Sequence, residues 1–174
     1  MPSVLIYGGS GQLGCVVVKE FKAAGYQVFS VDLRENPDAD HSITITGDGS
    51  LNDGKKVVES VSSKGKVDAV ICVAGGFVMS NIKDDAIFST LDRLVSFNLK
   101  SAVSCSYVAA HVLKENGLLV LTGATAGLGA TPGIFLYWSC NKAVMIAYGL
   151  TKAATHHLVD SLSKVDRKVF VIMF

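Results

Sequence analysis

Short apolar runs alternate along the chain with longer stretches in which apolar residues return every third or fourth position. A short apolar run bounded by glycine is typical of a buried strand, whereas the longer period is typical of an amphipathic helix. Gly25 follows the first amphipathic stretch as a helix stop. We therefore predict strands at 3–7, 27–33, 41–46, 67–76, 117–124 and 168–174, helices at 12–26, 51–64 and 143–163, and one or two helices within 84–114.

This alternation of strands and helices determines the fold class that we expect. Strands separated by helices form a parallel sheet that helices cover on both faces. We predict an α/β fold with a doubly wound parallel sheet, the Rossmann fold, in one domain over residues 1–174 that ends in its sixth strand. Ligands of such sheets bind outside the carboxyl ends of the strands, so the residues that follow the strands are the candidates for a site.

The composition agrees with a large buried core. Residues of the set AVILMFWYC make up 49% of the 174 residues, and only 18% are charged. A formal net charge of +1 argues against a nucleic-acid surface and against a polybasic membrane patch. The uncharged stretch 118–140 is long enough to cross a membrane, but its four glycines, three threonines and proline favour a strand followed by a loop.

Four cysteines are scattered along the chain, with no C-x-x-C pair and no histidine at the spacing of metal ligands. We interpret them as reduced thiols of a cytoplasmic protein, and we expect no metal site. The cysteines are Cys15, Cys72, Cys105 and Cys140.

A glycine-rich turn joins the first predicted strand to the first predicted helix. Residues without a Cβ allow backbone amides to approach a pyrophosphate, and the helix N-terminus adds partial positive charge. A glycine pattern alone is weak evidence, but this one stands in the strand–turn–helix context that dinucleotide binding requires. The cofactor-binding residues expected in this turn are Gly8, Gly9, Ser10, Gly11, Gln12, Leu13 and Gly14.

An acidic residue ends the second predicted strand. Asp32 follows Gly14 by eighteen residues, and a carboxylate there accepts hydrogen bonds from the ribose hydroxyls of adenosine and repels a 2′-phosphate. We therefore expect NADH as the cofactor and NADPH as the less favoured one. Arg34 lies two residues further on and weakens this preference, and Leu33 lies between the two in the expected cofactor site.

Small residues end the fourth predicted strand, at Ala74, Gly75 and Gly76. They leave room for the adenine and ribose side of a bound dinucleotide. Taken alone, this strand end is also typical of an ordinary turn, so it supports a cofactor site only together with the glycine-rich turn and Asp32.

Two tyrosines late in the chain are candidates for proton transfer, and only one has a lysine at helical spacing. Tyr148 and Lys152 are four residues apart and share a helix face. The ammonium group is expected to lower the pKa of the phenol and to hold the nicotinamide ribose, so that the phenol passes a proton to a substrate as hydride arrives from the cofactor. Tyr137 has Asn141 at this spacing and does not qualify.

Together these features resemble the short-chain dehydrogenase/reductase family. Within the family the chain is most similar to the pterin reductases, through the stretches 7–14, 31–43, 67–76, 116–133 and 145–158. The resemblance implies NADH-dependent reduction of a quinonoid dihydropteridine to a tetrahydropteridine, the step that recycles tetrahydrobiopterin, by a cytoplasmic homodimer. The residues that carry the family resemblance are Gly8, Gly9, Gly11, Gly14, Asp32, Ala74, Gly75, Gly76, Asn98, Leu99, Tyr148 and Lys152.

The resemblance also implies roles for three further residues. Ala124 stands where most of the family has a catalytic serine, and the pterin reductases share this absence because a quinonoid imine needs less polarisation than a ketone. Phe77 is expected to form an aromatic wall for the pterin ring, at the substrate site with Ala124 and Tyr148. Asn98 matches the helix-shaping asparagine of the family and is expected to hold a proton-relay water near Lys152 through its backbone.

Two features depart from the pattern of the family. Residues 134–144 interrupt the passage that leads to Tyr148, and we interpret them as a possible insertion. The chain ends at Phe174 within the sixth predicted strand, so we expect NADH binding with weak or absent turnover. Two alternatives stay open: a non-catalytic form that binds dinucleotide and dimerises, and a reductase for another carbonyl or imine. A homodimer is expected to pair through the helix 143–163.

Overall fold

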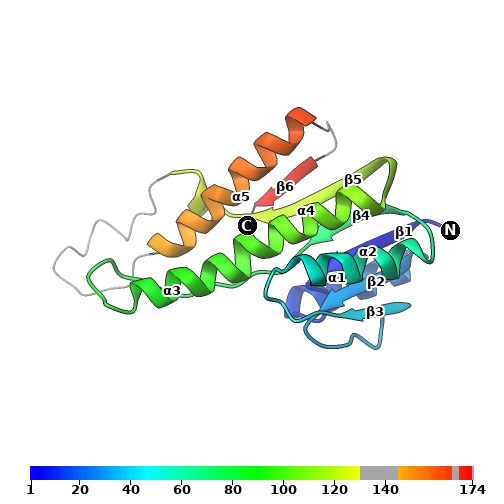
Figure 1. Ribbon diagram of the computed structural model, residues 1–174, viewed down its shortest axis with the longest axis horizontal. Helices are drawn as coiled ribbons and strands as arrows, with labels where there is room; N and C mark the ends of the chain where they lie inside the picture. The colour runs from blue at the N-terminus through cyan, green and yellow to red at the C-terminus, as the bar shows by residue number, and fades with distance from the viewer. Residues whose placement is uncertain (130–144, 166–168, 174) are drawn as a thin grey trace.

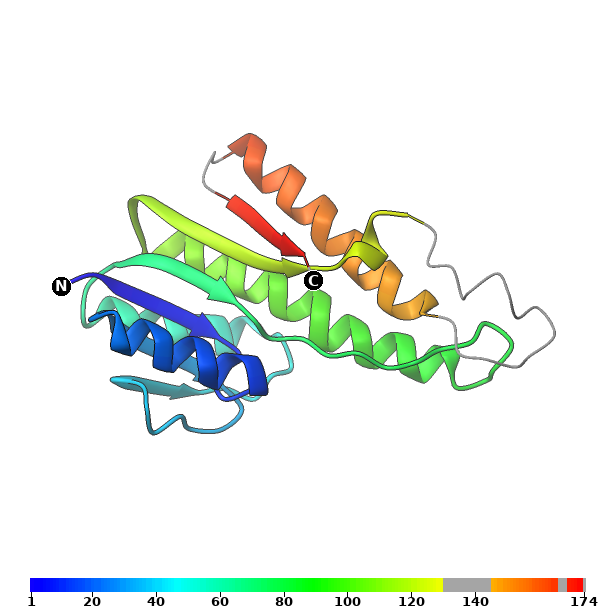
Figure 2. The ribbon, with the colours of Figure 1, turned by 180° about the vertical axis from the view of Figure 1, so that it is seen from behind.

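The computed structural model describes residues 1–129, 145–165 and 169–173. In this part of the chain a parallel sheet of six strands forms the centre, in the order β3-β2-β1-β4-β5-β6 (Figures 1 and 2). The predicted α/β fold with a doubly wound parallel sheet is therefore confirmed. The strands are β1 (Ser3–Tyr7), β2 (Gln27–Asp32), β3 (His41–Thr44), β4 (Val67–Cys72), β5 (Leu113–Gly123) and β6 (Val169–Met173).

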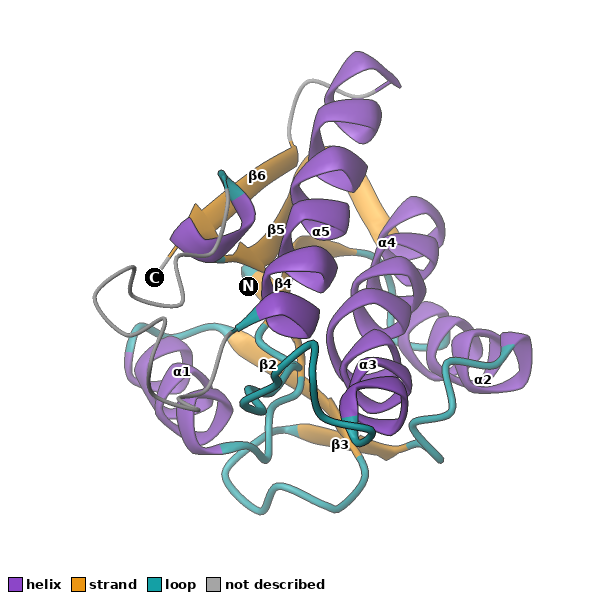
Figure 3. Ribbon diagram, turned by 90° about the vertical axis from the view of Figure 1, so that its left-hand side faces the viewer, coloured by secondary structure: helices purple, strands orange, loops and turns teal. Residues whose placement is uncertain are grey.

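Helices cover both faces of the sheet. Helix α1 lies on one face, and α2, α4 and α5 lie on the other (Figure 3). Alternate residues of β1 serve the two faces: Val4 and Ile6 pack in the cluster with α1, whereas Leu5 and Tyr7 pack in the cluster that includes α2 and α4. The helices are α1 (Gln12–Ala23), α2 (Leu51–Ser62), α3 (Ile87–Leu94), the π-helical η1 (Val95–Lys100), α4 (Ser101–Val112), the 3-10 turn η2 (Thr125–Gly127) and α5 (Ile146–Val165).

Several predicted boundaries differ from the structure. The helical stretch expected within 84–114 is divided into α3, η1 and α4, which follow one another directly. Strand β5 begins at Leu113 rather than at 117, because Val67 pairs with Leu113 and a register shift takes up the polar residues before Leu118. Residues 143–144 of the helix expected at 143–163, and the possible insertion at 134–144, lie outside the described residues.

The order of the strands creates a crevice at their carboxyl ends. Strand β1 lies between β2 and β4, so the chain leaves β1 toward one side of the sheet and returns at β4 on the other side. This reversal of strand order is where ligands bind in open α/β sheets. Among the helices that the structure describes, none has the length and apolar character needed to cross a bilayer.

Candidate functional site

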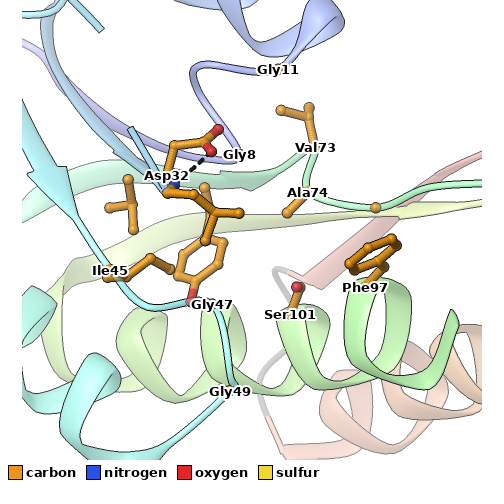
Figure 4. Close-up of a pocket in the computed structure, with 14 residues that line it drawn as sticks. Gly8, Gly11, Asp32, Ile45, Gly47, Gly49, Val73, Ala74, Phe97 and Ser101 are labelled. Atoms are coloured by element: carbon orange, nitrogen blue, oxygen red, sulfur yellow. Dashed lines mark hydrogen bonds between the residues drawn. The ribbon is translucent and has the colours of Figure 1, made fainter. Parts of the chain in front are cut away.

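A cavity of about 250 Å³ opens at this crevice. Gly8 and Gly11 border it from the turn after β1, and Asp32 borders it from the end of β2 (Figure 4). Val73 and Ala74 border it from the loop after β4. The residues that follow three neighbouring strands thus meet at one cavity, as the parallel arrangement predicted.

The glycine-rich turn packs too tightly to accept side chains. Gly8 has a φ of 94°, and a Cβ built on it would lie 2.5 Å from the backbone nitrogen of Ala74. A Cβ on Gly14 would overlap the carbonyl oxygen of Gly8, and one on Gly9 would overlap the hydroxyl of Ser30. These glycines therefore allow α1 to start directly at the cavity, where its first backbone N–H groups and its partial positive charge face an incoming ligand.

Asp32 joins the turn to the end of β2. Its Oδ2 accepts the N–H of Ser10 at 2.8 Å, and its Oδ1 accepts the N–H of Leu33 at 2.7 Å. A carboxylate has about four acceptor positions, so others remain for ribose hydroxyls. Arg34 is held by the same turn: its Nη2 donates to the carbonyl of Ser10 at 3.2 Å, and Ser10 Oγ donates to the carbonyl of Arg34 at 2.9 Å.

Asn98 ties the loop after β4 to α5. Its Oδ1 accepts the N–H of Gly76 at 2.9 Å, and its Nδ2 donates to the carbonyl of Gly76 at 3.1 Å and to Oγ1 of Thr151 at 3.0 Å. A Cβ built on Gly75 would lie 2.8 Å from Oδ1 of Asn98 and 3.8 Å from Nζ of Lys152. The structure therefore brings four of the predicted site residues together at the β4 side of the cavity.

The surroundings of Asn98 differ from the expected ones. The residue is 2% exposed and lies in the π-helical η1, a type of turn that is frequent at functional sites. It is the side chain that reaches the loop after β4, while the backbone carbonyl accepts an N–H at the end of η1. The water relay through this carbonyl stays a prediction.

Lys152 bonds to β5 rather than to the phenol. It is 4% exposed, and its Nζ donates to the carbonyl of Thr122 at 2.8 Å, a contact that sequence reasoning missed. Its Nζ lies 5.8 Å from the centre of the Tyr148 ring, so the two share a helix face as predicted. The expectation that the ammonium lowers the pKa of Tyr148 is wrong, because burial raises the pKa of this phenol, and desolvation lowers the pKa of Lys152.

Phe77 lies against the candidate proton donor. Its ring packs edge-to-face on Tyr148, with 5.1 Å between the ring centres and an interplanar angle of 86°. The segment that carries Phe77 is held beside the start of α5, because Ala147 donates its N–H to Oγ of Ser80 at 3.1 Å. Phe77 is 51% exposed, so its free face is available for a second ring.

Ala124 is buried at the end of β5, and its backbone is fixed by a histidine that sequence reasoning missed. The N–H of Ala124 donates to Nε2 of His156 at 3.1 Å. Because Nε2 accepts, the proton of the neutral imidazole is on Nδ1. Lys152 and His156, one helical turn apart on α5, thus both bind the backbone at the end of β5.

A loop after β3 forms a further wall that was not predicted. Ile45, Gly47 and Gly49 border the cavity near Asp32. Gly47 and Gly49 have φ values of 76° and 71°, which favour glycine. The available signal was the pair of glycines directly after a predicted strand, since such a pair indicates a constrained turn.

Comparison of the sequence with known families identifies the class. The profile of the NAD dependent epimerase/dehydratase family matches residues 4–174. The chain therefore belongs to this family.

Two curated relatives illustrate the range of similar proteins. The chain is 43% identical over 162 residues to the dihydropteridine reductase of Dictyostelium discoideum, covering 92% of this chain and 65% of that protein. It is 27% identical over 172 residues to the 1,2-dihydroxy-1,2-dihydronaphthalene dehydrogenase of Pseudomonas putida, covering 91% of this chain and 65% of that protein. The chain thus spans about two thirds of the length of the curated relatives it matches, 65% in both cases.

Solved structures of short-chain dehydrogenases/reductases share the fold. One from Serratia marcescens BCRC 10948 superposes with a TM-score of 0.78 at 19% identity and covers 99% of this chain and 72% of that chain. BdcA in complex with NADPH superposes with a TM-score of 0.71 at 21% identity and covers 99% of this chain and 68% of that chain. Together with the curated relatives they confirm the predicted resemblance to the short-chain dehydrogenase/reductase family.

Proposed function

We propose that this chain binds NADH at the carboxyl edge of its sheet and reduces a quinonoid dihydropteridine to a tetrahydropteridine, as in tetrahydrobiopterin recycling. One observation carries the proposal: the glycine-rich turn and Asp32 border the same cavity as Gly75, which lies directly beside Nζ of Lys152. The 43% identity to a dihydropteridine reductase supports the choice of substrate.

The residues at the carboxyl edge of the sheet fit a nicotinamide dinucleotide. The N-terminus of α1 would hold the pyrophosphate, Asp32 the adenosine ribose, and Lys152 with Tyr148 the nicotinamide ribose. The packing around Gly8 and Gly14 leaves no room for a Cβ, so the backbone itself forms the wall that a pyrophosphate would approach. When bound, the cofactor supplies the hydride.

The proton is the contribution of Tyr148. Because burial raises the pKa of its phenol, the group is protonated at neutral pH and acts as a general acid. Lys152 lies one turn away on α5, with its Nζ 5.8 Å from the centre of the Tyr148 ring and bonded to the carbonyl of Thr122, so it would hold the nicotinamide ribose beside the phenol. Ala124 offers no hydroxyl at the position where the resemblance places the catalytic serine of most of the family, which suits an imine nitrogen that takes the proton directly.

The choice of NADH over NADPH rests on the carboxylate of Asp32. A 2′-phosphate on the adenosine ribose would meet this negative charge, whereas two ribose hydroxyls would find acceptors there. Arg34 is oriented toward the turn by its bond to Ser10, so its guanidinium compensates only part of the repulsion. The resemblance further supports a cytoplasmic homodimer that pairs through α5, where Leu150 is exposed.

Binding and turnover are tested separately. The full chain is titrated with NADH, and the absorbance of reduced nicotinamide is then followed after addition of a quinonoid dihydropteridine. We expect binding by the native chain and by Tyr148→Phe, with the weak turnover expected of the native chain lowered about 100-fold in the variant, because a positioned general acid contributes at least this factor. Tyr26→Phe, at a tyrosine that packs on Phe21 away from the cavity, should leave both quantities unchanged.

The outcomes separate the alternatives. A native chain that binds no NADH overturns the proposal. Binding without any oxidation of NADH, unchanged by Tyr148→Phe, identifies the non-catalytic form that binds dinucleotide. Oxidation of NADH by a different carbonyl or imine, but not by the dihydropteridine, identifies a reductase for another substrate.

A further inference from the structure

One buried carboxylate organises the loop after β3. Asp53, in the first turn of α2, is 5% exposed. It accepts the N–H of Thr46 at 3.0 Å, the hydroxyl of Thr46 at 2.8 Å and the N–H of Gly47 at 2.9 Å. Its own N–H donates to Oγ of Ser50 at 3.3 Å. A single residue therefore holds both ends of the loop 46–50.

This loop spans the Asp32 end of the cavity (Figure 4). Gly47 lies against Leu33, since a Cβ on Gly47 would overlap the side chain of Leu33. Gly49 lies against the aliphatic part of Lys100 at the end of η1, since a Cβ built on Gly49 would lie 2.8 Å from the Cβ of Lys100. The loop thus reaches from the end of β2 to the start of α4, across the place assigned to the adenosine.

The bonds of Asp53 are not those of a simple helix cap. A carboxylate at the third helical position commonly reaches back to the backbone N–H of the N-cap residue. Here the N-cap is Ser50, and the carboxylate of Asp53 instead binds Thr46 and Gly47 at the beginning of the loop. Its hydrogen bonds therefore determine the shape of the cavity wall in addition to the start of α2.

We propose that Asp53 is a positioning residue that sets the affinity of the chain for the adenosine half of the dinucleotide, by holding the loop 46–50 as the wall beside Asp32. The inference rests on the proposed dinucleotide binding. A loop with two glycines loses much conformational entropy when it is ordered. Asp53 orders it before the ligand arrives, so that binding does not have to supply this free energy.

The test divides the dinucleotide into its halves. Calorimetric titrations measure the dissociation constants of ADP-ribose and of reduced nicotinamide mononucleotide for the native chain, Asp53→Asn and Glu59→Gln. Asp53→Asn keeps the shape and one acceptor, so the fold is retained while the three bonds to the loop are weakened. Glu59→Gln removes the same charge from an exposed position of the same helix.

We expect Asp53→Asn to raise the dissociation constant of ADP-ribose about tenfold, the effect of roughly one lost hydrogen bond. The dissociation constant of reduced nicotinamide mononucleotide should stay unchanged. Glu59→Gln should change neither constant. Hydrogen exchange in the free chain gives a second readout, in which the amides of Thr46 and Gly47 exchange about tenfold faster in Asp53→Asn than in the native chain.

Each other outcome overturns the inference. Equal weakening of both halves shows that Asp53 acts on the whole fold, and unchanged binding of ADP-ribose shows that the loop does not contribute. If the native chain binds both halves and Asp53→Asn binds ADP-ribose equally well, only this inference fails. If the native chain binds neither half, the proposed function fails with it.

Discussion

Replacement of Asn98 by alanine is predicted to destabilise the fold and to loosen the β4 side of the cavity. The side chain makes three hydrogen bonds, two to the backbone of Gly76 and one to Thr151, in a place where it is 2% exposed. At about 1 kcal/mol for each bond, the loss is about 3 kcal/mol. For a chain of this length the melting temperature falls by about 2–4 °C per kcal/mol, hence by about 6–12 °C.

A second substitution tests the chemistry of the amide itself. Thr151 donates its hydroxyl proton to the carbonyl of Tyr148 at 2.8 Å, so toward Asn98 it can only accept. In Asn98→Asp, a carboxylate oxygen would face this acceptor and the carbonyl of Gly76 without a proton between them. We therefore expect Asn98→Asp to lose at least as much stability as Asn98→Ala, although it is nearly isosteric with the native residue.

Urea unfolding followed by circular dichroism measures both losses. Asn52→Ala, at an exposed position of α2, is the matched control and should change the free energy of unfolding by less than about 0.5 kcal/mol. A loss below about 1 kcal/mol for Asn98→Ala, or an Asn98→Asp variant as stable as the native chain, would contradict the assignment of the three bonds.

Three further predictions concern the glycine-rich turn, the phenol and β5. Burial raises the pKa of Tyr148, so the ultraviolet titration of this phenol, measured as the difference between the native chain and Tyr148→Phe, should have a midpoint above pH 10. The free energy of unfolding should fall as the pH rises through that midpoint. A midpoint below pH 10 contradicts this prediction. Gly8→Ala should abolish NADH binding, because its Cβ would overlap the backbone of Ala74. Gly25 also has a positive φ but open space around it, so Gly25→Ala should only lower the free energy of unfolding by about 1 kcal/mol. Equal effects of the two substitutions on NADH binding would refute the tight packing around Gly8. His156→Leu leaves the N–H of Ala124 without its acceptor and should lower the free energy of unfolding by about 1–3 kcal/mol. His156→Gln keeps an acceptor and should restore part of this stability. Equal stability of the two variants would exclude the bond.

The parts of the fold that were predicted are those governed by local pattern. The continuous apolar run of β1, followed by glycines and an amphipathic stretch, indicates a buried strand, a tight turn and a helix without any knowledge of the partners. The same holds for Asp32, which ends a strand, and for Tyr148 and Lys152, whose spacing of four residues requires only a helix. These residues lie where the pattern predicted them.

The parts that were missed depend on contacts between distant segments. The π-helical η1 forms where Asn98 binds Gly76 and Thr151, residues far from it in the sequence, so no local period indicates it. The bond between Ala124 and His156 joins a strand end to a helix in the same way. The direction of the pKa change at Tyr148 depends on burial, which the spacing of two residues cannot report.

The central claim is that one dinucleotide lies along the carboxyl edge of the sheet, from Asp32 to Lys152. A crystal structure of the chain with NADH tests it most directly. We expect the pyrophosphate at the N-terminus of α1, the adenosine ribose on the carboxylate of Asp32, and the nicotinamide ring beside Tyr148 and Lys152. A dinucleotide bound elsewhere, or with its adenosine beside Lys152, would contradict the account.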